Sequence, residues 1–310
     1  MISIIVPVFR NAGSALELVR LLRLQELPND STLEIIMVDD GSGDDSTSRL
    51  QQHEDEHVRL IALPRNMGRS AARNAGAYHA QGKFLVFIDC DCRPEGQRFL
   101  STHLEVLRGG CVASLGPVVA PEGDDAFWSR YQNEASARRA RQHARGIFYS
   151  GSTANFAVHA DAYRQCNGFD PRYIAYGFED RDLLVRLSHM GRLGWCPEAR
   201  ITHLDALTLP GVLEKMRTAA GTSAELFSHD HLEAYRSLGY AELDVRLHPW
   251  LSPIATLTKP LLGAAPVVDR LLGQPWIPYR LFKPIVKALV AIAYMQGTTL
   301  ASPGPAPRAT

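Results

Sequence analysis

The first third of the sequence alternates between strand-like and helix-like stretches, and no other feature limits the possible folds as strongly. Short apolar runs rich in β-branched residues predict strands, and apolar residues at helical spacing predict the stretches between them to be helices. A repeated strand–helix order implies a mostly parallel sheet, wound right-handedly, with helices on both faces. The predicted strands span residues 2–8, 33–38, 58–63 and 84–89, and the predicted helices span 15–24, 45–52 and 69–80.

Two carboxylates one residue apart, Asp89 and Asp91, end the fourth predicted strand. That strand is apolar throughout, as expected of a strand buried on both faces, and its carboxyl end is where open α/β folds bind ligands. Neighbouring carboxylates are costly to desolvate unless a cation lies between them. Mg²⁺ and Mn²⁺ accept one or two carboxylates together with diphosphate oxygens. An Asp-x-Asp pair is also common in turns and helix caps, so its meaning depends on the accompanying motifs.

Composition favours a cytoplasmic globular protein that does not bind nucleic acid. The 310 residues hold 33 basic and 33 acidic side chains, so no overall charge attracts a polyanion. The five cysteines are odd in number and lie mostly beside apolar runs, which favours buried, reduced thiols over a disulfide framework or a zinc site. The N-terminus predicts a strand rather than a signal peptide. No uninterrupted apolar stretch reaches the roughly 18–20 residues that a membrane-spanning helix needs.

The pattern changes after the fourth strand. Residues 96–230 predict a second half of the same domain, in which residues 123–146, polar and arginine-rich, form a long surface excursion. The arginines between Arg138 and Arg145 could hold an anionic acceptor or could form a solvated face. The other predicted elements are helices over 97–107, 179–190 and 211–229 and strands over 111–119 and 146–158.

Residues 231–300 predict a helical appendage. Within it, residues 249–297 are apolar, interrupted by prolines and punctuated by lysine and arginine. Such a segment could lie on a membrane surface, pack on the catalytic domain or form a dimer interface; we favour peripheral membrane contact at the cytoplasmic face. Residues 301–310 are rich in proline and alanine and predict a disordered tail. The oligomeric state does not follow from the sequence.

Five motifs occur in order along the chain, and together they identify a family resemblance. They are VPVF over 6–9, VDDGS over 38–42, RNMGRSAARNAG over 65–76, DCD over 89–91 and YGFEDRDL over 176–183. This ordered set resembles the family 2 glycosyltransferases of the GT-A fold over residues 1–230. The last motif is also similar to a C-terminal motif of β-1,4-galactosyltransferases. The resemblance implies a nucleotide-binding half over 1–95 and an acceptor and catalytic half over 96–230.

The resemblance also assigns residues to the nucleotide. Asp39 matches a base-recognising position, where a carboxylate can accept the N3–H of uracil, while Asp40 is assigned to the turn that follows. Pro7 and Phe9 would line the base, although a proline there could simply end the strand. Arg69 would reach the base or the diphosphate; the alternative is a solvated arginine, which a helix N-terminus does not favour.

A divalent cation follows from the same resemblance. Asp91 would bind the metal directly, and Asp89 would lie against the ribose or share the metal. His203 matches a position that completes the metal site in many relatives, although a lone histidine is more often structural. An imidazole ligand suits Mn²⁺ better than Mg²⁺, and either ion would neutralise the departing diphosphate.

The remaining assignments concern proton transfer and the acceptor. By resemblance Asp180 is the general base and Glu179 contacts the donor sugar or the acceptor, although acids in the first turn of a helix are also ordinary macrodipole partners. Tyr176, Asp182 and Trp195 are expected at the acceptor; for the two aromatic residues, burial in the core is the alternative.

These assignments predict a metal-dependent, inverting glycosyltransferase. A UDP-sugar would be the donor, and a hydroxyl of a glycan or a lipid-linked molecule would be the acceptor. A retaining enzyme of the same fold and a non-catalytic nucleotide-sugar-binding subunit are the alternatives. A sugar-phosphate nucleotidyltransferase would need a glycine-rich, lysine-bearing loop after the first strand, which residues 10–14 lack.

Overall fold

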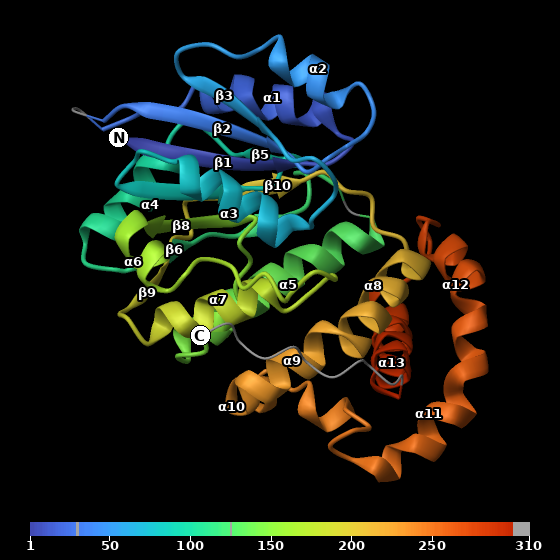
Figure 1. Ribbon diagram of the computed structural model, residues 1–310. Coiled ribbons are helices and arrows are strands. Elements are labelled where there is room, and N and C mark those ends of the chain that lie inside the picture. The colour runs from blue at the N-terminus through green and yellow to red at the C-terminus, as the bar shows by residue number, and fades with distance from the viewer. Residues whose placement is uncertain (29–30, 125, 300–310) are drawn as a thin grey trace.

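A mostly parallel sheet of seven strands forms the core of the computed structural model, which describes residues 1–28, 31–124 and 126–299 (Figure 1). Strand β8 runs antiparallel to its neighbours β4 and β6, and the other pairs are parallel. The predicted sheet is therefore confirmed, whereas the tail predicted over 301–310 lies outside the described residues. In spatial order the strands are β3 (Val58–Ala62), β2 (Leu33–Asp39), β1 (Ile2–Val8), β4 (Phe84–Ile88), β8 (Asn155–His159), β6 (Ala113–Leu115) and β9 (Leu193–Trp195).

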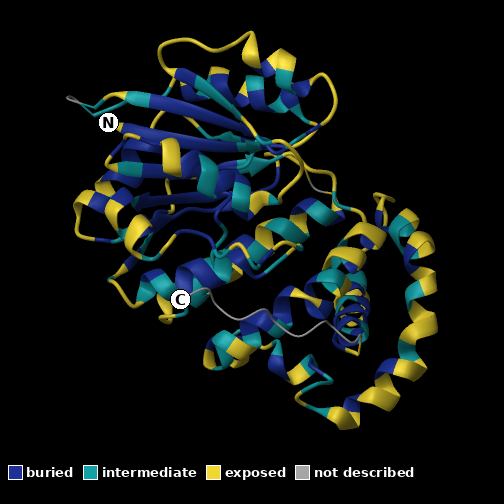
Figure 2. Ribbon diagram, in the orientation of Figure 1, coloured by how far each residue is buried: buried dark blue, intermediate teal, exposed yellow. Residues whose placement is uncertain are grey.

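Alternate residues of the central strands supply two separate hydrophobic cores. On β1, Ile4 and Val6 belong to one core and Ile5 belongs to the other, as the two-residue period of a strand requires. The first core lies under α1 (Ala12–Leu22) and α4 (Phe99–Arg108), with α2 (Ser46–Gln51) nearby. The second lies under α3 (Arg69–His79), α6 (Ala160–Gln165) and α7 (Glu179–Ser188). Figure 2 shows these strands buried between exposed helix faces.

A second sheet of three short strands lies beside the carboxyl end of β4 and was not predicted. It consists of β5 (Cys92–Pro94), β10 (Ile201–His203) and β7 (Val118–Val119). Asn155 on β8 ties the two sheets together, because its side-chain amide donates hydrogen bonds to the carbonyls of Pro117 at 2.9 Å and Ala199 at 2.7 Å. Pro117 directly precedes β7 and Ala199 lies two residues before β10, so the position of β10 is fixed relative to the main sheet.

The segment over 123–146 is a helix, and its prediction as a surface excursion was wrong. Helix α5 (Phe127–Ala144) buries Phe127 at one end and Ser136 near its middle, while most of its other side chains are exposed or half-buried. With so few apolar residues the helical period is nearly invisible in the sequence. The strand predicted over 146–158 is also shorter than expected, because a 3₁₀ turn, η1 (Phe148–Ser150), precedes β8.

The C-terminal third is helical, as predicted. The helix predicted over 211–229 divides at Thr222 into α8 (Leu209–Gly221) and α9 (Ser223–Asp230). Helix α13 (Tyr279–Thr298) packs along α8, and α11 and α12 arch around this pair (Figure 1). The remaining segments are α10 (Leu232–Ser237), η2 (Ala241–Leu243), η3 (Pro249–Leu251), α11 (Ser252–Thr258), η4 (Lys259–Ala264) and α12 (Ala265–Leu272).

One helical stretch is long and apolar enough, by length and composition alone, to cross a membrane. It covers the consecutive segments η3 to α12, 24 residues from Pro249 to Leu272, with a mean hydropathy of 1.2. The sequence predicted no membrane-spanning stretch here, since prolines and Lys259 interrupt the apolar run. The structure shows that helical backbone continues through these interruptions.

Candidate active site

A cavity of about 380 Å³ opens at the carboxyl ends of β1 and β4, beside the N-terminus of α3. This is the edge at which parallel sheets bind ligands, because strand ends and helix N-termini meet there. Residues far apart in the sequence converge on it from three directions: the ends of β1 and β4, the start of α3, and the loop before α7. The lining residues expected from the sequence are Pro7, Phe9, Arg69, Asp89, Asp91 and Tyr176.

Asp39 and Asp40 have the reverse of their expected positions. Asp40 lines the cavity, and its two carboxylate oxygens accept the backbone N–H of Met67 at 2.7 Å and of Gly68 at 3.0 Å. Burial raises the pKa of Asp40 above its ordinary value, although these two N–H groups oppose the shift. Asp39 is buried and accepts hydrogen bonds from the hydroxyls of Ser42 and Thr47, so it holds the turn instead.

Gly41 allows the loop of Asp40 to approach the loop that leads into α3. Its φ is +64°, and a Cβ at this position would lie 2.2 Å from the carbonyl carbon of Arg65. Any other residue would therefore push the two loops apart. The glycine thus keeps Asp40 within hydrogen-bond reach of Met67 and Gly68.

A buried arginine, Arg73, joins the acidic end of β4 to the acidic start of α7. Its Nη2 donates to Asp89 Oδ1 at 2.6 Å, and its Nη1 lies 3.5 Å from Asp180 Oδ1. The guanidinium also lies over the ring of Phe169, 5.2 Å from its centroid. Its Nε and Nη1 are buried and have no hydrogen-bond partner among the described residues.

The pKa values of Asp89 and Glu179 shift in opposite directions. Burial favours the neutral form of Asp89, but the charge of Arg73, assisted by Arg69, outweighs it and lowers the pKa of Asp89 below its ordinary value. Burial raises the pKa of Glu179, and the nearby charge of Asp180 adds to the rise, against the opposing effect of Arg69. Arg69 Nη1 lies 3.6 Å from Glu179 Oε1, and its guanidinium covers the ring of Tyr176.

Asp180 is held from two sides at the start of α7. The hydroxyl of Thr153 donates to its Oδ1, and the backbone N–H of Thr153 donates to Oδ2 at 3.3 Å. The helix begins abruptly because Phe178 has the left-handed φ of +67° and buries its ring. The carboxylate therefore has a fixed orientation while 22% of its side chain stays exposed.

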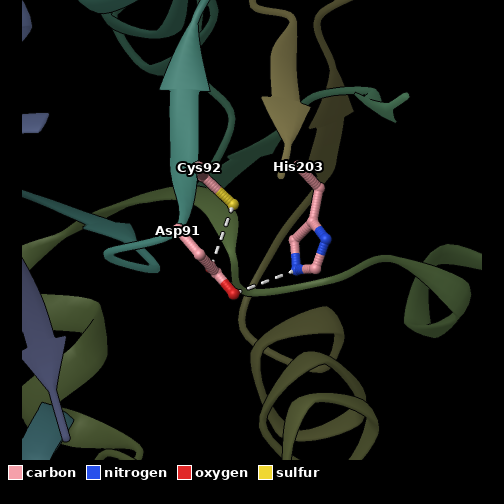
Figure 3. A group of neighbouring side chains, drawn as sticks. All are labelled: Asp91, Cys92 and His203. Carbon is pink, nitrogen blue, oxygen red and sulfur yellow. Dashed lines mark hydrogen bonds and ion pairs between the residues drawn. The ribbon is translucent and has the colours of Figure 1, made fainter. Parts of the chain in front are cut away.

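Asp91, Cys92 and His203 form a group whose ligand atoms all lie within 4.8 Å of one another (Figure 3). His203 lies opposite Cys92 in the β5–β10 pairing, and its Nε2 is 3.5 Å from Asp91 Oδ2. Burial raises the pKa of Asp91, and Asp89 adds to the rise while His203 opposes it. A carboxylate and an imidazole are suitable ligands for Mn²⁺. Burial holds the pKa of Cys92 far above its ordinary value, so its thiol is a poor metal ligand.

Two residues predicted at the acceptor do not line the cavity. Asp182 is fully buried, and its carboxylate accepts hydrogen bonds from Arg186 and from His231, which lower its pKa against the effect of burial. Trp195 lies on β9 at the far edge of the main sheet, where it packs on the second core and against the ring of His143. Neither residue is therefore placed at this cavity, because long-range packing decides which side chains reach it.

Arg73 is the site residue that the sequence analysis missed, although it lies within a quoted motif. A signal was present: Ala72, Gly76 and Ala77 predict the buried face of this helix, and Arg73 falls on the same face. Its neighbours behave as packing residues. Asn74 accepts hydrogen bonds from Tyr163 and from the backbone of Phe169, and a Cβ on Gly76 would come within 2.5 Å of Ile5.

Comparison with known proteins identifies the family. A family model described as glycosyl transferase family 2 matches residues 3–173, which is more than half of the chain. The chain belongs to glycosyl transferase family 2. The Asp89–Asp91 pair, the motif of α3 and the cavity all lie within this matched region, except for the lining residues Ile174, Ala175 and Tyr176.

Solved structures confirm the GT-A fold of this family 2 chain. It is similar to the mannosyltransferase PcManGT from Pyrobaculum calidifontis, in complex with GDP-Man and Mn²⁺, with a TM-score of 0.61 and 17% identity over 95% of this chain and 86% of that one. It is also similar to S. aureus TarS 1–349 in complex with UDP, with a TM-score of 0.52 and 16% identity over 96% and 90%.

Curated relatives share a shorter region. The chain is 33% identical over 93 residues to an undecaprenyl-phosphate 4-deoxy-4-formamido-L-arabinose transferase of Salmonella choleraesuis (strain SC-B67) and 38% identical to that of Pseudomonas syringae pv. syringae (strain B728a). Each match covers 29% of this chain and spans 28% of the relative's length.

The burial of Arg73 predicts a large, charge-specific stability effect in this family 2 enzyme. Arg73→Met should lower the free energy of unfolding at neutral pH by about 3 kcal/mol, because it leaves buried carboxylates without their counter-charge. Adding Asp89→Asn should recover part of the loss. Arg164→Met, which removes an exposed ion pair, should cost less than about 1 kcal/mol. Urea unfolding measures all four proteins, and equal effects of the two arginine variants would contradict the assignment.

Proposed function

We propose that the protein transfers a sugar from a nucleotide sugar, preferentially a UDP-sugar, to a lipid-linked acceptor, with the help of a divalent cation and with inversion at the anomeric carbon. The observation that carries the proposal is that Asp89 and Asp91 line one cavity of a family 2 chain and that Arg73 links Asp89 to Asp180. Displacing a diphosphate by an alcohol needs charge neutralisation on one side and a proton acceptor on the other. This group of carboxylates and its neighbours supply both.

Asp40 is the residue we assign to the base of the nucleotide. Its oxygens already accept two backbone N–H groups, but each carboxylate oxygen has a further lone pair that can accept the N3–H of uracil. Pro7 and Phe9 line the cavity close to it. Arg69, at the first turn of α3, is placed to pair with the diphosphate, which would explain a cation at a helix N-terminus.

Asp91 and His203 are the residues we assign to the cation, with Asp89 against the ribose. Bound Mn²⁺ or Mg²⁺ would stabilise the negative charge on the departing diphosphate. PcManGT and GalNAc-T7, which are similar in fold, are described in complexes that contain Mn²⁺. Asp91 and His203 supply two ligands, and diphosphate oxygens and water can complete the coordination.

Asp180 is the general base of the proposed reaction. Thr153 orients its carboxylate, and Arg73 offsets the repulsion from Asp89 and Glu179, so that Asp180 can accept the proton of the attacking hydroxyl. A single in-line displacement from the opposite face would then invert the anomeric centre. Glu179, whose pKa is raised by burial, would donate a hydrogen bond to the donor sugar or the acceptor when it is protonated.

A phosphate-bearing acceptor fits the basic residues behind Asp180. Arg139 on α5 is near both Arg181 and Arg138, and burial together with these like charges lowers the pKa of Arg139. Arg181 follows Asp180 directly and donates to the hydroxyl of Tyr240 at 3.0 Å. Like charges held together gain from an anion between them. The curated relatives are named for transfer to undecaprenyl phosphate, an acceptor of this kind.

The role of Asp180 predicts a variant that binds donor and fails in transfer. Asp180→Asn preserves shape but cannot take the proton, so turnover should fall by about 10² to 10⁴-fold while the dissociation constant for UDP stays within about threefold of wild type. Asp161→Asn, on an exposed helix start, is the matched control and should retain full turnover. Turnover of Asp180→Asn within tenfold of wild type would remove it as the base.

The role of Asp91 and His203 predicts metal-dependent nucleotide binding. Calorimetry should show that Mn²⁺ tightens UDP binding to the wild type and to Cys92→Ala, because the buried thiol is not a ligand. Asp91→Ala and His203→Ala should each lose at least about tenfold of this Mn²⁺-dependent gain. Retention of the gain in both variants would show that the cation binds elsewhere, and its loss in Cys92→Ala would add sulfur to the ligand set.

The role of Asp40 predicts a loss of base selectivity. The wild type should bind UDP about tenfold more tightly than CDP, since cytosine has no N3–H to donate and a hydrogen bond to a charged group is worth about 1.5 kcal/mol or more. Asp40→Asn should reduce this ratio towards one. Asp39→Asn should lower the thermal midpoint and keep the UDP/CDP ratio of the wild type. Loss of the ratio in Asp39→Asn and its retention in Asp40→Asn would instead assign the base to Asp39.

A further inference from the structure

Large apolar residues are exposed along the arch formed by η3, α11, η4 and α12, in the loop that follows and at the start of α13. Figure 2 colours much of the arch ribbon as exposed. Trp250, Leu257 and Trp276 are 66%, 79% and 68% exposed, respectively. A monomeric soluble protein rarely exposes several such residues together without a partner for them. We call this surface the outer arch face; its members are Trp250, Ile254, Leu257, Leu261, Val267, Trp276, Leu281 and Ile285.

The arch carries two apolar stripes, and packing within the chain explains one of them. The inner stripe is buried against α8 and α13 and contains Leu251, Ala255, Leu262, Ala265 and Leu272, of which Leu262 is half-buried. The outer stripe runs beside it at the same helical spacing of three or four residues, through Trp250, Ile254, Leu257 and Leu261. If these helical segments packed only against α8 and α13, the inner stripe alone would be sufficient. The outer stripe therefore points to a second apolar environment.

Charge identifies that environment. Residues 249–298 contain five basic side chains and a single acidic one, Asp269, which accepts the backbone N–H of Leu209 at 2.6 Å. Of the basic residues, Lys283 pairs with Glu134. The other four are exposed and form no ion pair with any residue that the structure describes; they are Lys259, Arg270, Arg280 and Lys287. Exposed tryptophans combined with unpaired cations match the headgroup region of an anionic bilayer.

The shape of the arch favours lying on a membrane over crossing it. Pro253, Pro260 and Pro266 each stand at the start of a new helical segment, so the stretch curves and does not form one straight rod. Its inner stripe also covers apolar residues of α8 and α13, which insertion would uncover. The last two turns of α13 are buried within the chain, so the membrane contact is narrower than the predicted 249–297.

We propose that the outer arch face binds the surface of an anionic lipid bilayer, with the tryptophans at headgroup depth and the basic residues against lipid phosphates. The backbone N–H of Leu209 donates a hydrogen bond to Asp269 on α12, which joins the arch to the start of α8. Leu209 follows His203 on β10 by six residues, so the arch lies a short stretch of chain away from the proposed metal site. This inference concerns lipid binding alone and stands whether or not the proposed sugar transfer is correct.

Vesicle co-sedimentation of the full chain tests the proposal without donor or acceptor. The wild type should sediment with phosphatidylcholine vesicles containing phosphatidylglycerol, more weakly with phosphatidylcholine alone, and should be released by alkaline carbonate. The triple variant W250S/L257S/W276S should bind the anionic vesicles at least about tenfold more weakly. The charge variant K259E/R280E should lose the preference for anionic vesicles.

The control variant L24S/Y78S/M190S removes exposed apolar side chains elsewhere on the surface and should sediment like the wild type. Size-exclusion chromatography with light scattering, run on the same proteins, checks that each variant is folded and reports its oligomeric state. Failure of the wild type to sediment would overturn the proposal. A wild-type dimer that becomes monomeric in the triple variant would also overturn it, because a second copy would then cover the face. Retention of the wild type on the vesicles after carbonate would overturn it as well, because the arch would then span the bilayer.

Discussion

The arrangement of the active site depends on one buried cation, the guanidinium of Arg73. It bridges Asp89 at the end of β4 and Asp180 at the start of α7, two elements that are 91 residues apart in the chain. Without it, several carboxylates would converge on one partly buried site without compensation, which costs several kcal/mol per unpaired charge. A residue of α3 therefore holds the start of α7 in place. The two halves of the domain are joined at the point where the chemistry is proposed to occur.

The two carboxylates of the Asp-Cys-Asp motif differ in how their charge is compensated. Arg73 holds the pKa of Asp89 below its ordinary value, so the protein itself stabilises that charge. Asp91 lies beside the imidazole of His203 and the thiol of Cys92, and burial together with Asp89 raises its pKa. Such a carboxylate gains most from an external cation. One motif thus provides an internally paired acid and, one residue later, an acid available to a metal.

The sequence predicted the strand–helix order and the edge at which the site would form, because buried strands and strand ends carry local signals. The sequence predicted less about the elements and side chains whose positions depend on long-range packing. The three short strands around His203 are too brief to show a period, and α5 is too polar to show one. The sequence pointed to Asp39, whereas Asp40 lines the cavity, because adjacent residues at a strand end face opposite ways and the loop of Gly41 brings Asp40 to it.

The central claim is that a divalent cation held by Asp91 and His203 lies beside the diphosphate, within reach of the acid that Arg73 holds at α7. Anomalous diffraction from crystals soaked with UDP and Mn²⁺ tests it most directly. The account predicts one manganese peak bound by Asp91 and His203 and by diphosphate oxygens, with uracil against Asp40 and Asp180 facing the open side of the diphosphate. A strand end without manganese beside bound UDP, or a nucleotide outside this cavity, would contradict it.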